Sequence, residues 1–286
     1  MKLKYKLLLI FSLIIFIFFI WFFSQTPSND RNWNSDQQLL SWAELTASNN
    51  SQINVYNIRN ISYSSTTDFN VSYYNKTFDL NNLNSVYFMV EPFAQWQGAA
   101  HTFLSFGFQN ENLGDDIEDD LEDEYLVISV EIRKEVGEHF SSVKGLLRQY
   151  ELMYVFGDEN DLIKLRSNYR NDSVYLYPIK AEKQKIKLLF LDMVERTNNI
   201  KQNPEFYNTL TSSCTTNIVD HVNKISPKKI PFDFRILAPG YSGKLAYEVG
   251  LIDTNLPWEQ AQQHFKINKN ALIYANDPNF SKKIRE

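Results

Sequence analysis

The stretch Ala99-Ala-His-Thr-Phe-Leu-Ser-Phe-Gly-Phe-Gln109 decides the fold, because its residue types alternate along the chain. In an extended chain successive side chains point to opposite sides, so every second residue shares a face. One side of this stretch collects Ala100, Thr102, Leu104, Phe106 and Phe108. The other side carries His101, Phe103 and Ser105. The alternation predicts a strand with an apolar face toward a core and a histidine on the opposite face.

Residues 125–133 repeat the pattern. Leu126, Ile128, Val130 and Ile132 face one way, whereas Ser129, Glu131 and Arg133 face the other. The same reasoning predicts a strand here, next to the first one. Further strands are predicted at Ile53–Arg59, Phe69–Phe78, Val86–Phe93, Tyr150–Phe156 and Val174–Pro178.

Helical patterns dominate the second half of the chain. Between the last two strands a helix is predicted over Glu159–Tyr169, and a longer one over Ala181–Asn198 carries an apolar stripe at helical spacing. Ser212 or Ser213 can cap a helix whose first turn contains Cys214. A short helix around Asp36–Thr46, a helical turn at Pro204 and short helices after Pro231 complete the prediction. Strands first and helices later favour the α+β class, an antiparallel sheet packed with helices.

Charge and composition exclude several function classes. The chain has 286 residues and a formal net charge of -5, and eight acids lie between Asp115 and Glu124. Between the N-terminal apolar run and the C-terminus, acids and bases balance once that acidic stretch is set aside, which argues against nucleic-acid binding. One cysteine excludes a disulfide framework and a zinc site built on several thiolates. No Gly-rich phosphate loop is present either, so we expect no metal or cofactor. The acidic stretch is interpreted as a solvated loop, with calcium binding as the alternative.

An apolar run near the N-terminus predicts a membrane segment. Residues 7–23 contain no charge, and this run is just long enough to cross a bilayer as a helix. The lysines in residues 1–6 favour a cytoplasmic N-terminus. A cleaved signal peptide is the alternative, but Trp21, Phe22 and Phe23 are poor residues for a cleavage site. We therefore expect an uncleaved signal anchor, a tether with a short helix over 24–50, and a domain over 51–286 outside the cytoplasm.

Cys214, His101 and Glu131 are the best candidates for catalytic residues. A helix N-terminus and a nearby imidazolium both lower the pKa of a thiol, so Cys214 at a capped helix start, with His101 as general base, would suit a thiol nucleophile. Glu131 is the preferred group to orient the imidazole, with Ser129 as the weaker candidate. The alternatives are a buried, inert cysteine and a surface pair between Glu131 and Arg133. His221 lies two helical turns beyond the cysteine and is a poor base.

Four strings carry a resemblance to a known family: His101-Thr-Phe-Leu-Ser-Phe-Gly-Phe108, Ile128-Ser-Val-Glu-Ile-Arg-Lys-Glu135, Arg148-Gln-Tyr-Glu-Leu-Met-Tyr154 and Tyr207-Asn-Thr-Leu-Thr-Ser-Ser-Cys-Thr-Thr-Asn217. From about Asn54 onward the chain resembles the Lnb N-terminal periplasmic domain family. The resemblance implies a permuted papain-like thiol fold, in which the histidine strand precedes the cysteine helix. It also implies that Cys214 and His101 are the catalytic pair, with Glu131 in the segment that carries the third polar residue.

The resemblance suggests an activity and also marks a difference. The family's namesake is a bacterial lipoprotein N-acyltransferase, in which such a domain precedes further membrane helices. Nothing after Cys214 in this chain is long and apolar enough to span a bilayer. We therefore expect a protein of the bacterial inner membrane, held by one helix, whose periplasmic domain acts on a lipid, lipoprotein or amide through a thioester. A cell-wall peptidase and a non-enzymatic envelope binding module remain as alternatives.

Overall fold

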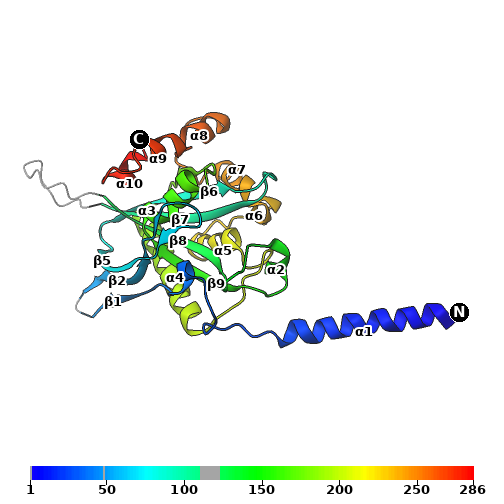
Figure 1. Cartoon of the computed structure of the whole chain (residues 1–286). Helices are drawn as coiled ribbons and strands as arrows, with labels where there is room; N and C mark the ends of the chain where they lie inside the picture. The colour runs from blue at the N-terminus through cyan, green and yellow to red at the C-terminus, as the bar shows by residue number, and fades with distance from the viewer. Residues whose placement is uncertain (1, 48, 110–122) are drawn as a thin grey trace, which may run out of the picture.

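The computed structural model describes residues 2–47, 49–109 and 123–286. Most of the acidic stretch between Asp115 and Glu124, and with it the prediction of a solvated or calcium-binding loop, lies outside them. The chain begins with α1 (Lys2–Ser24), which projects away from a single mixed domain (Figure 1). Among the described residues one helix, Leu3–Ser24, is long and apolar enough to cross a membrane, and none of it is buried.

The domain is built on an eight-stranded sheet with the order β1-β2-β9-β8-β7-β6-β10, and the eighth strand, β5, also pairs with β2. All its ladders are antiparallel apart from a short parallel contact between β2 and β9. The strands are β1 (Trp42–Thr46), β2 (Asn49–Arg59), β5 (Tyr73–Asp79), β6 (Leu83–Pro92), β7 (Ala100–Phe108), β8 (Glu124–Arg133), β9 (Glu151–Gly157) and β10 (Tyr175–Pro178). A separate two-stranded pair is formed by β3 (Ser62–Tyr63) and β4 (Phe69–Asn70).

Helices cover both faces of this sheet. The first face packs on α4 (Lys183–Gln202), α5 (Cys214–Ile225) and α7 (Ser242–Glu248). The second face packs on α3 (Glu159–Lys164), α9 (Asn268–Ile273) and α10 (Phe280–Lys283). The other short elements are η1 (Ser35–Gln37), α2 (Ser142–Leu146), η2 (Leu165–Tyr169), α6 (Phe234–Leu237), η3 (Pro239–Tyr241) and α8 (Trp258–His264). The predicted α+β class is confirmed.

Alternation along β7 and β8 assigns their side chains to the two faces as predicted. Leu104 and Phe106 of β7, with Ile128 and Val130 of β8, belong to the core on the first face. Phe103 of β7 belongs to the core on the second face. Because alternate residues share a face, His101 lies on the second face together with Phe103, and their rings stack with centroids 5.5 Å apart.

The segment before the sheet differs from its prediction. Only Ser35–Gln37 is helical, and Trp42–Thr46, expected at the end of a helix, forms β1 against β2. The Trp42 ring stacks on Tyr56 of β2 at 4.0 Å between centroids. Cross-strand packing of this kind outweighs local helical preference. The helical turn expected at Pro204 is also absent, because the chain there runs extended alongside β9, where Leu152 donates to the carbonyl of Glu205.

The polar segment after α1 is attached to the domain over part of its length. The backbone N–H of Ser28 donates to Oε1 of Glu151 at 3.1 Å, and Arg31 forms an ion pair with the same carboxylate at 2.8 Å. The side chain of Asn29 donates to the carbonyl of Lys201. Only Gln25–Pro27 therefore separate α1 from the first attached residue.

Candidate functional site

Cys214 is the first residue of α5, and a capping box holds this helix start in place. Ser213 is the N-cap, its hydroxyl accepts from the backbone N–H of Thr216, and the Thr216 hydroxyl accepts from the backbone N–H of Ser213. The thiol is buried, and its polar contact is the hydroxyl of Thr215 at 3.8 Å. The predicted cap and the predicted place of the cysteine in the first turn are both confirmed.

His101 lies where pairing between two central strands ends. The ladder between β7 and β8 stops at Phe103 and Ser129, although β7 continues beside β6 and β8 continues beside β9. We call this point the β7–β8 fork. Beyond this point the side chains of β7 and β8 no longer cover each other across the ladder. Other groups can therefore contact them there.

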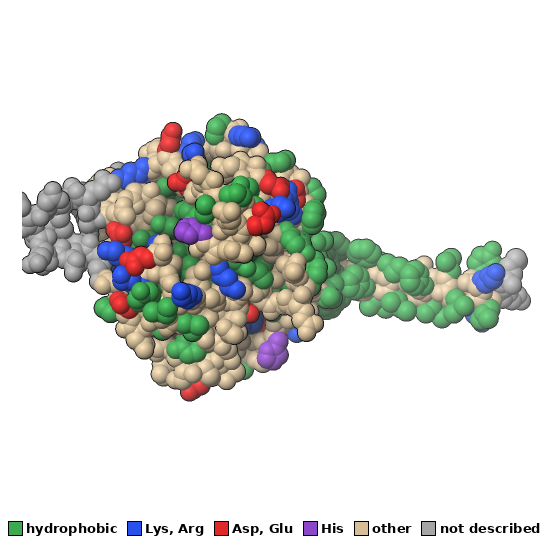
Figure 2. Space-filling model, turned by 90° about the horizontal axis from the view of Figure 1, so that it is seen from above, with side chains coloured by type: hydrophobic (Ala, Val, Ile, Leu, Met, Phe, Trp, Pro, Cys, Tyr) green, Lys and Arg blue, Asp and Glu red, His purple; other side chains and the backbone are tan. Residues whose placement is uncertain are grey.

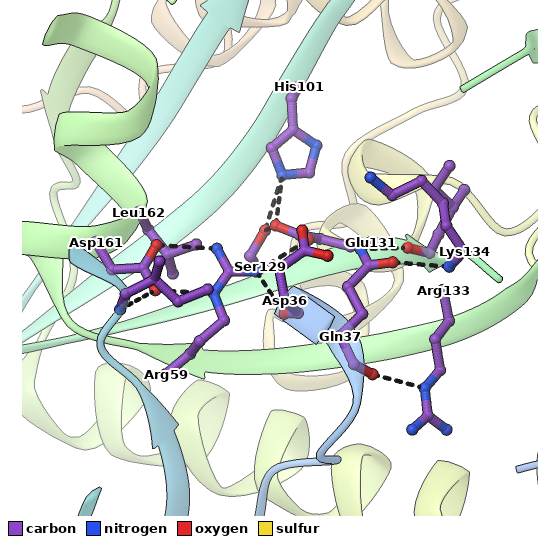
Figure 3. Close-up of polar contacts among 12 residues, drawn as sticks. Asp36, Gln37, Arg59, His101, Ser129, Glu131, Arg133, Lys134, Asp161 and Leu162 are labelled. Carbon is purple, nitrogen blue, oxygen red and sulfur yellow. Dashed lines mark hydrogen bonds and ion pairs between the residues drawn. The ribbon is translucent and has the colours of Figure 1, made fainter. Parts of the chain in front are cut away.

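At the fork His101 contacts both of the polar residues predicted to orient it. Nε2 of the imidazole lies 2.8 Å from the Ser129 hydroxyl, which donates to Oε1 of Glu131 at 2.9 Å (Figure 3). The ring nitrogen itself is 3.9 Å from the Glu131 carboxylate. A hydroxyl carries one proton, and Ser129 uses it toward Glu131, so its oxygen accepts from Nε2–H of His101. The imidazole therefore carries its proton on Nε2 and presents Nδ1 as the acceptor.

Buried arginines surround Glu131 and replace the surface pair with Arg133 considered from the sequence. Arg166 lies 3.1 Å from its carboxylate, and Arg59 lies 3.9 Å away. Arg133 turns elsewhere and donates to the backbone carbonyls of Gln37 and Gln38. Burial alone would raise the pKa of Glu131, but the charges of Arg59 and Arg166 outweigh it and hold that pKa well below its usual range.

The arginines also act on His101. Burial, followed by the positive charge of Arg166, lowers the pKa of His101 to about 3, and the Glu131 carboxylate offsets only part of this shift. The imidazole is consequently neutral at physiological pH. Where the ring now lies, it cannot provide the imidazolium that would stabilise a thiolate.

Two further carboxylates complete the network. Glu91, the cross-strand neighbour of His101 on β6, pairs with Arg166 at 2.6 Å, and burial raises the pKa of Glu91 to about 7. Asp161 on α3 pairs with Arg59 at 2.9 Å. Arg166 itself lies on η2, a π-helical turn that continues α3. Sequence reasoning missed these residues, although Glu91 follows the apolar run of β6 and Arg166 follows Leu165; a charge in an apolar pattern indicates a buried partner.

The structure does not join the predicted catalytic pair directly. Thr102, next to His101, turns to the first face, where its hydroxyl lies 2.9 Å from that of Thr215 on α5. Cys214 belongs to the core on that first face, whereas His101 stacks on Phe103 on the second. Among the described residues no hydrogen bond links Cys214 to His101. The two side chains approach the β7–β8 fork from opposite faces of the sheet.

His221, set aside as a base, has a different environment. Its Nδ1 contacts Asp192 of α4 at 2.5 Å, and its Nε2 lies 2.8 Å from the hydroxyl of Tyr154 on β9. The same tyrosine donates to Asn217, one turn from Cys214 on α5. These contacts tie α5 to α4 and to the sheet.

An apolar cavity of about 350 Å³ lies beside the start of α5 on the first face. Its volume is within the range of about 300–1,000 Å³ that is typical of small-molecule sites. Side chains from β6, β7, α4, α5 and α7 line it, including Phe88, Leu104, Leu189, Thr215, Ile218 and Leu245. Lys180, Glu182 and Lys185 supply polar groups at its α4 side. Thr215 places one wall of this cavity next to Cys214.

No metal site accompanies these features within residues 2–47, 49–109 and 123–286, where no group of three His, Cys, Asp or Glu side chains could hold an ion.

None of the curated proteins and none of the solved structures compared with this chain matches it. A family model does match: the Lnb N-terminal periplasmic domain corresponds to residues 70–240, more than half of the chain. The strings around His101, Glu131 and Cys214 all fall inside this range. With one N-terminal apolar helix ahead of it, the match fits a periplasmic domain anchored to a membrane by a single pass. The chain belongs to the Lnb N-terminal periplasmic domain family.

Proposed function

We propose that the protein is a thiol-dependent acyltransferase or hydrolase of the bacterial inner membrane, with Cys214 as the nucleophile. The observation that carries the proposal is the apolar cavity whose wall includes Thr215, the neighbour of the cysteine. A cavity lined by aliphatic side chains, with lysines at one side, suits the acyl chain of a lipid or lipoprotein better than a polar peptide stem.

In the proposed reaction, the sulfur of Cys214 attacks the carbonyl carbon of an acyl donor and forms a thioester. The donor's C–O or C–N bond breaks, and the leaving group takes the proton that His101 received from the thiol. Water or an amine then attacks the thioester, the C–S bond breaks, and the thiol regains its proton. Backbone N–H groups at Cys214 and Thr215 would stabilise the negative oxygen.

His101 must move for this reaction, since its ring now lies on the second face. We propose that it rotates at the β7–β8 fork and offers Nδ1 to the thiol. Burial and then the charge of Arg166 lower the pKa of His101, and rotation would remove the second of these two causes and so raise the basicity of the ring. Glu131 and Ser129 would act as positioning residues for the ring. A permuted papain-like arrangement of the histidine strand and the cysteine helix is part of this proposal.

Thiol labelling tests the pair. Iodoacetamide should modify Cys214 rapidly at neutral pH in the full chain, and His101→Ala should slow the reaction. His264→Ala changes an exposed histidine on α8 and is the matched control. Slow labelling that ignores His101→Ala would contradict a catalytic pair.

A trapped intermediate tests the acyl donor. Mass spectrometry of Cys214 from protein purified out of membranes should show a thioester-linked fatty acyl chain. Val222→Trp, which fills the cavity, should reduce the adduct, whereas Leu272→Trp on the exposed side of α9 should not. Release of peptides from wall material, lost in Cys214→Ser, would instead support a peptidase.

The separation of His101 from Cys214 favours one second candidate, a lipid-binding module without turnover. In that case the cavity would hold a lipid reversibly, and the thiol would be an inert part of the core. Extractable lipid bound in equal amounts by the parent and by Cys214→Ala, with no thioester in either, would support this candidate over the first.

The proposed orientation in the membrane follows from the lysines at the start of α1. Lys2, Lys4 and Lys6 favour a cytoplasmic N-terminus, which sends the domain into the periplasm. Protease added to intact spheroplasts should digest the domain, while an N-terminal epitope tag should be digested only after lysis.

A further inference from the structure

The attachment of the tether holds the domain against the membrane. α1 ends at Ser24, and the backbone N–H of Ser28 is hydrogen-bonded to Glu151. Four residue steps of about 3.5 Å allow at most ~14 Å between Ser24 and Ser28. A headgroup layer is ~5–7 Å thick on each side of a bilayer. The domain is far wider than the distance that the tether can span beyond this layer. One side of the domain must therefore face the lipid surface closely.

A cation–π cluster indicates which side this is. The guanidinium of Arg148, just after α2, lies over the ring of Phe22 at 4.6 Å and over that of Phe206 at 6.0 Å. These contacts bring the end of the membrane helix to the side of the domain that carries α2. Figure 1 shows α2, α6 and the tip of the β6–β7 hairpin along the side from which α1 leaves.

Large apolar side chains are exposed on this same side. Trp96, Phe140, Val143, Leu210, Phe232 and Phe234 are all at least 49% exposed, and Phe232 reaches 80%. We call these six residues the apolar rim. Figure 2 shows hydrophobic side chains gathered where the domain meets α1. Isolated exposed apolar residues are normal, whereas a contiguous group marks an interaction surface.

Contacts within the structure connect the segments that carry the rim. Thr209, next to Leu210, donates to the carbonyl of Ser142 on α2. The Phe140 ring meets Phe93 of the β6–β7 hairpin edge-on at 5.7 Å.

The path continues from the hairpin to α6. The backbone N–H of Gly240 donates to the carbonyl of Gly98, two residues after Trp96, and Tyr241 contacts the ring of Phe234 at 6.3 Å. An unbroken series of contacts therefore runs from α2 beside the membrane anchor to Phe234.

We infer that the apolar rim inserts into the periplasmic leaflet and forms a second membrane contact, separate from α1. Aromatic side chains, Trp above all, prefer the interface between headgroups and hydrocarbon. Exposed Lys228 and Lys229 precede Phe232 and can pair with lipid phosphates. The orientation fixed by α1 and the short tether makes lipid the surface that the rim meets. This inference does not depend on any chemistry at Cys214.

Site-directed spin labelling tests the inference in the full chain, placed as single copies in lipid nanodiscs. In a Cys214→Ala background, labels are attached at Phe140→Cys, Phe234→Cys and, as the matched control, Ile273→Cys. Ile273 is also exposed and apolar, at 61%, and it belongs to α9, a helix on a side of the domain away from α1 (Figure 1). Power saturation then compares collisions with oxygen, which dissolves in lipid, and with a water-soluble nickel chelate.

Labels at positions 140 and 234 should show an oxygen-to-nickel accessibility ratio several-fold above that at 273. Equal ratios at all three positions would mean that the rim faces water and would overturn the inference. Protection from both reagents in single-copy discs would indicate burial by the chain itself. Protection found only in vesicles with many copies would indicate a second copy, and each of these results would also overturn it.

A measurement without added labels provides a check on perturbation. In vesicles of brominated lipid, Trp96→Phe should remove a measurable share of the quenched tryptophan fluorescence. Trp258→Phe, which changes a half-buried residue on α8, should leave the quenched share unchanged. Unaltered quenching in Trp96→Phe would contradict insertion of the hairpin tip.

Discussion

The hydroxyls of Thr102 and Thr215 lie 2.9 Å apart in the interior, and this contact joins the strand that carries His101 to the helix that begins at Cys214. Each threonine stands next to one member of the predicted catalytic pair. The contact therefore sets the distance between strand and helix, even though His101 itself turns to the other face. Both hydroxyls are almost fully buried, so neither can exchange its partner for bulk water.

Removing one of these hydroxyls should destabilise the protein. Thr102→Val keeps the shape but leaves the Thr215 hydroxyl with only the weak contact to the Cys214 thiol, which costs about 1–3 kcal/mol in the free energy of unfolding. The double variant Thr102→Val/Thr215→Val removes both groups and should recover part of the loss. Urea unfolding of the full chain in detergent measures all three proteins. Additive losses in the double variant would show that the hydroxyls do not interact.

The buried arginine network should be sensitive to loss of its central cation. Arg166→Met leaves Glu91 and Glu131 without their closest positive charge, and breaking a buried pair costs about 3–5 kcal/mol. Arg170→Met is the matched control. Arg170 lies farther from Glu91 than Arg166 does, at 3.6 Å, and is 43% exposed, so its removal should cost at most about 1 kcal/mol in the free energy of unfolding. Comparable urea midpoints for the two variants would contradict the central role of Arg166.

The low pKa of His101 should appear as a pH dependence of stability. Between pH about 3 and 6.5 the unfolded chain binds a proton at this residue that the folded protein does not bind. The contribution of His101 to stability is therefore present at neutral pH and is lost as the pH falls.

His101→Asn isolates this effect from other titrating groups. The difference in unfolding free energy between the parent and the variant should move in the parent's favour from pH 4 to pH 7 and then level off. Urea unfolding at unit pH steps measures it. The elevated pKa of Glu91 acts in the opposite direction and cancels in the difference. A difference that is constant with pH would mean that neither burial nor the charge of Arg166 lowers the pKa of His101 in the folded protein.

The cap of α5 should contribute both to stability and to the reactivity of the thiol. Ser213→Ala removes the hydroxyl that accepts from Thr216, at a cost of about 0.5–2 kcal/mol. Fraying of the first turn should also change the rate at which iodoacetamide modifies Cys214. Ser213→Asn keeps a capping side chain and should retain most of the parental stability and rate. An identical loss in both variants would mean that the side chain of Ser213 matters for packing alone.

The sequence by itself determined the elements whose periodicity is strong. Alternation from Ala100 to Phe108 and from Tyr125 to Arg133 predicted β7 and β8 and the faces of their side chains, because a strand repeats every two residues. The serine cap and the apolar stripe likewise predicted α5 and α4. The uncharged run over residues 7–23 likewise predicted the one described helix that is long and apolar enough to cross a membrane.

Other features depended on contacts between distant residues, which no local pattern contains. Trp42–Thr46 became a strand because it pairs with β2, and the segment around Ser28 is attached because Glu151 accepts its N–H. Only the tertiary structure paired Glu131 with Arg59 and Arg166, which come from a strand and a π-helical turn far away in sequence. It also placed His101 and Cys214 on opposite faces, because neighbouring residues of one strand must point in opposite directions and Thr102 is the one that meets α5.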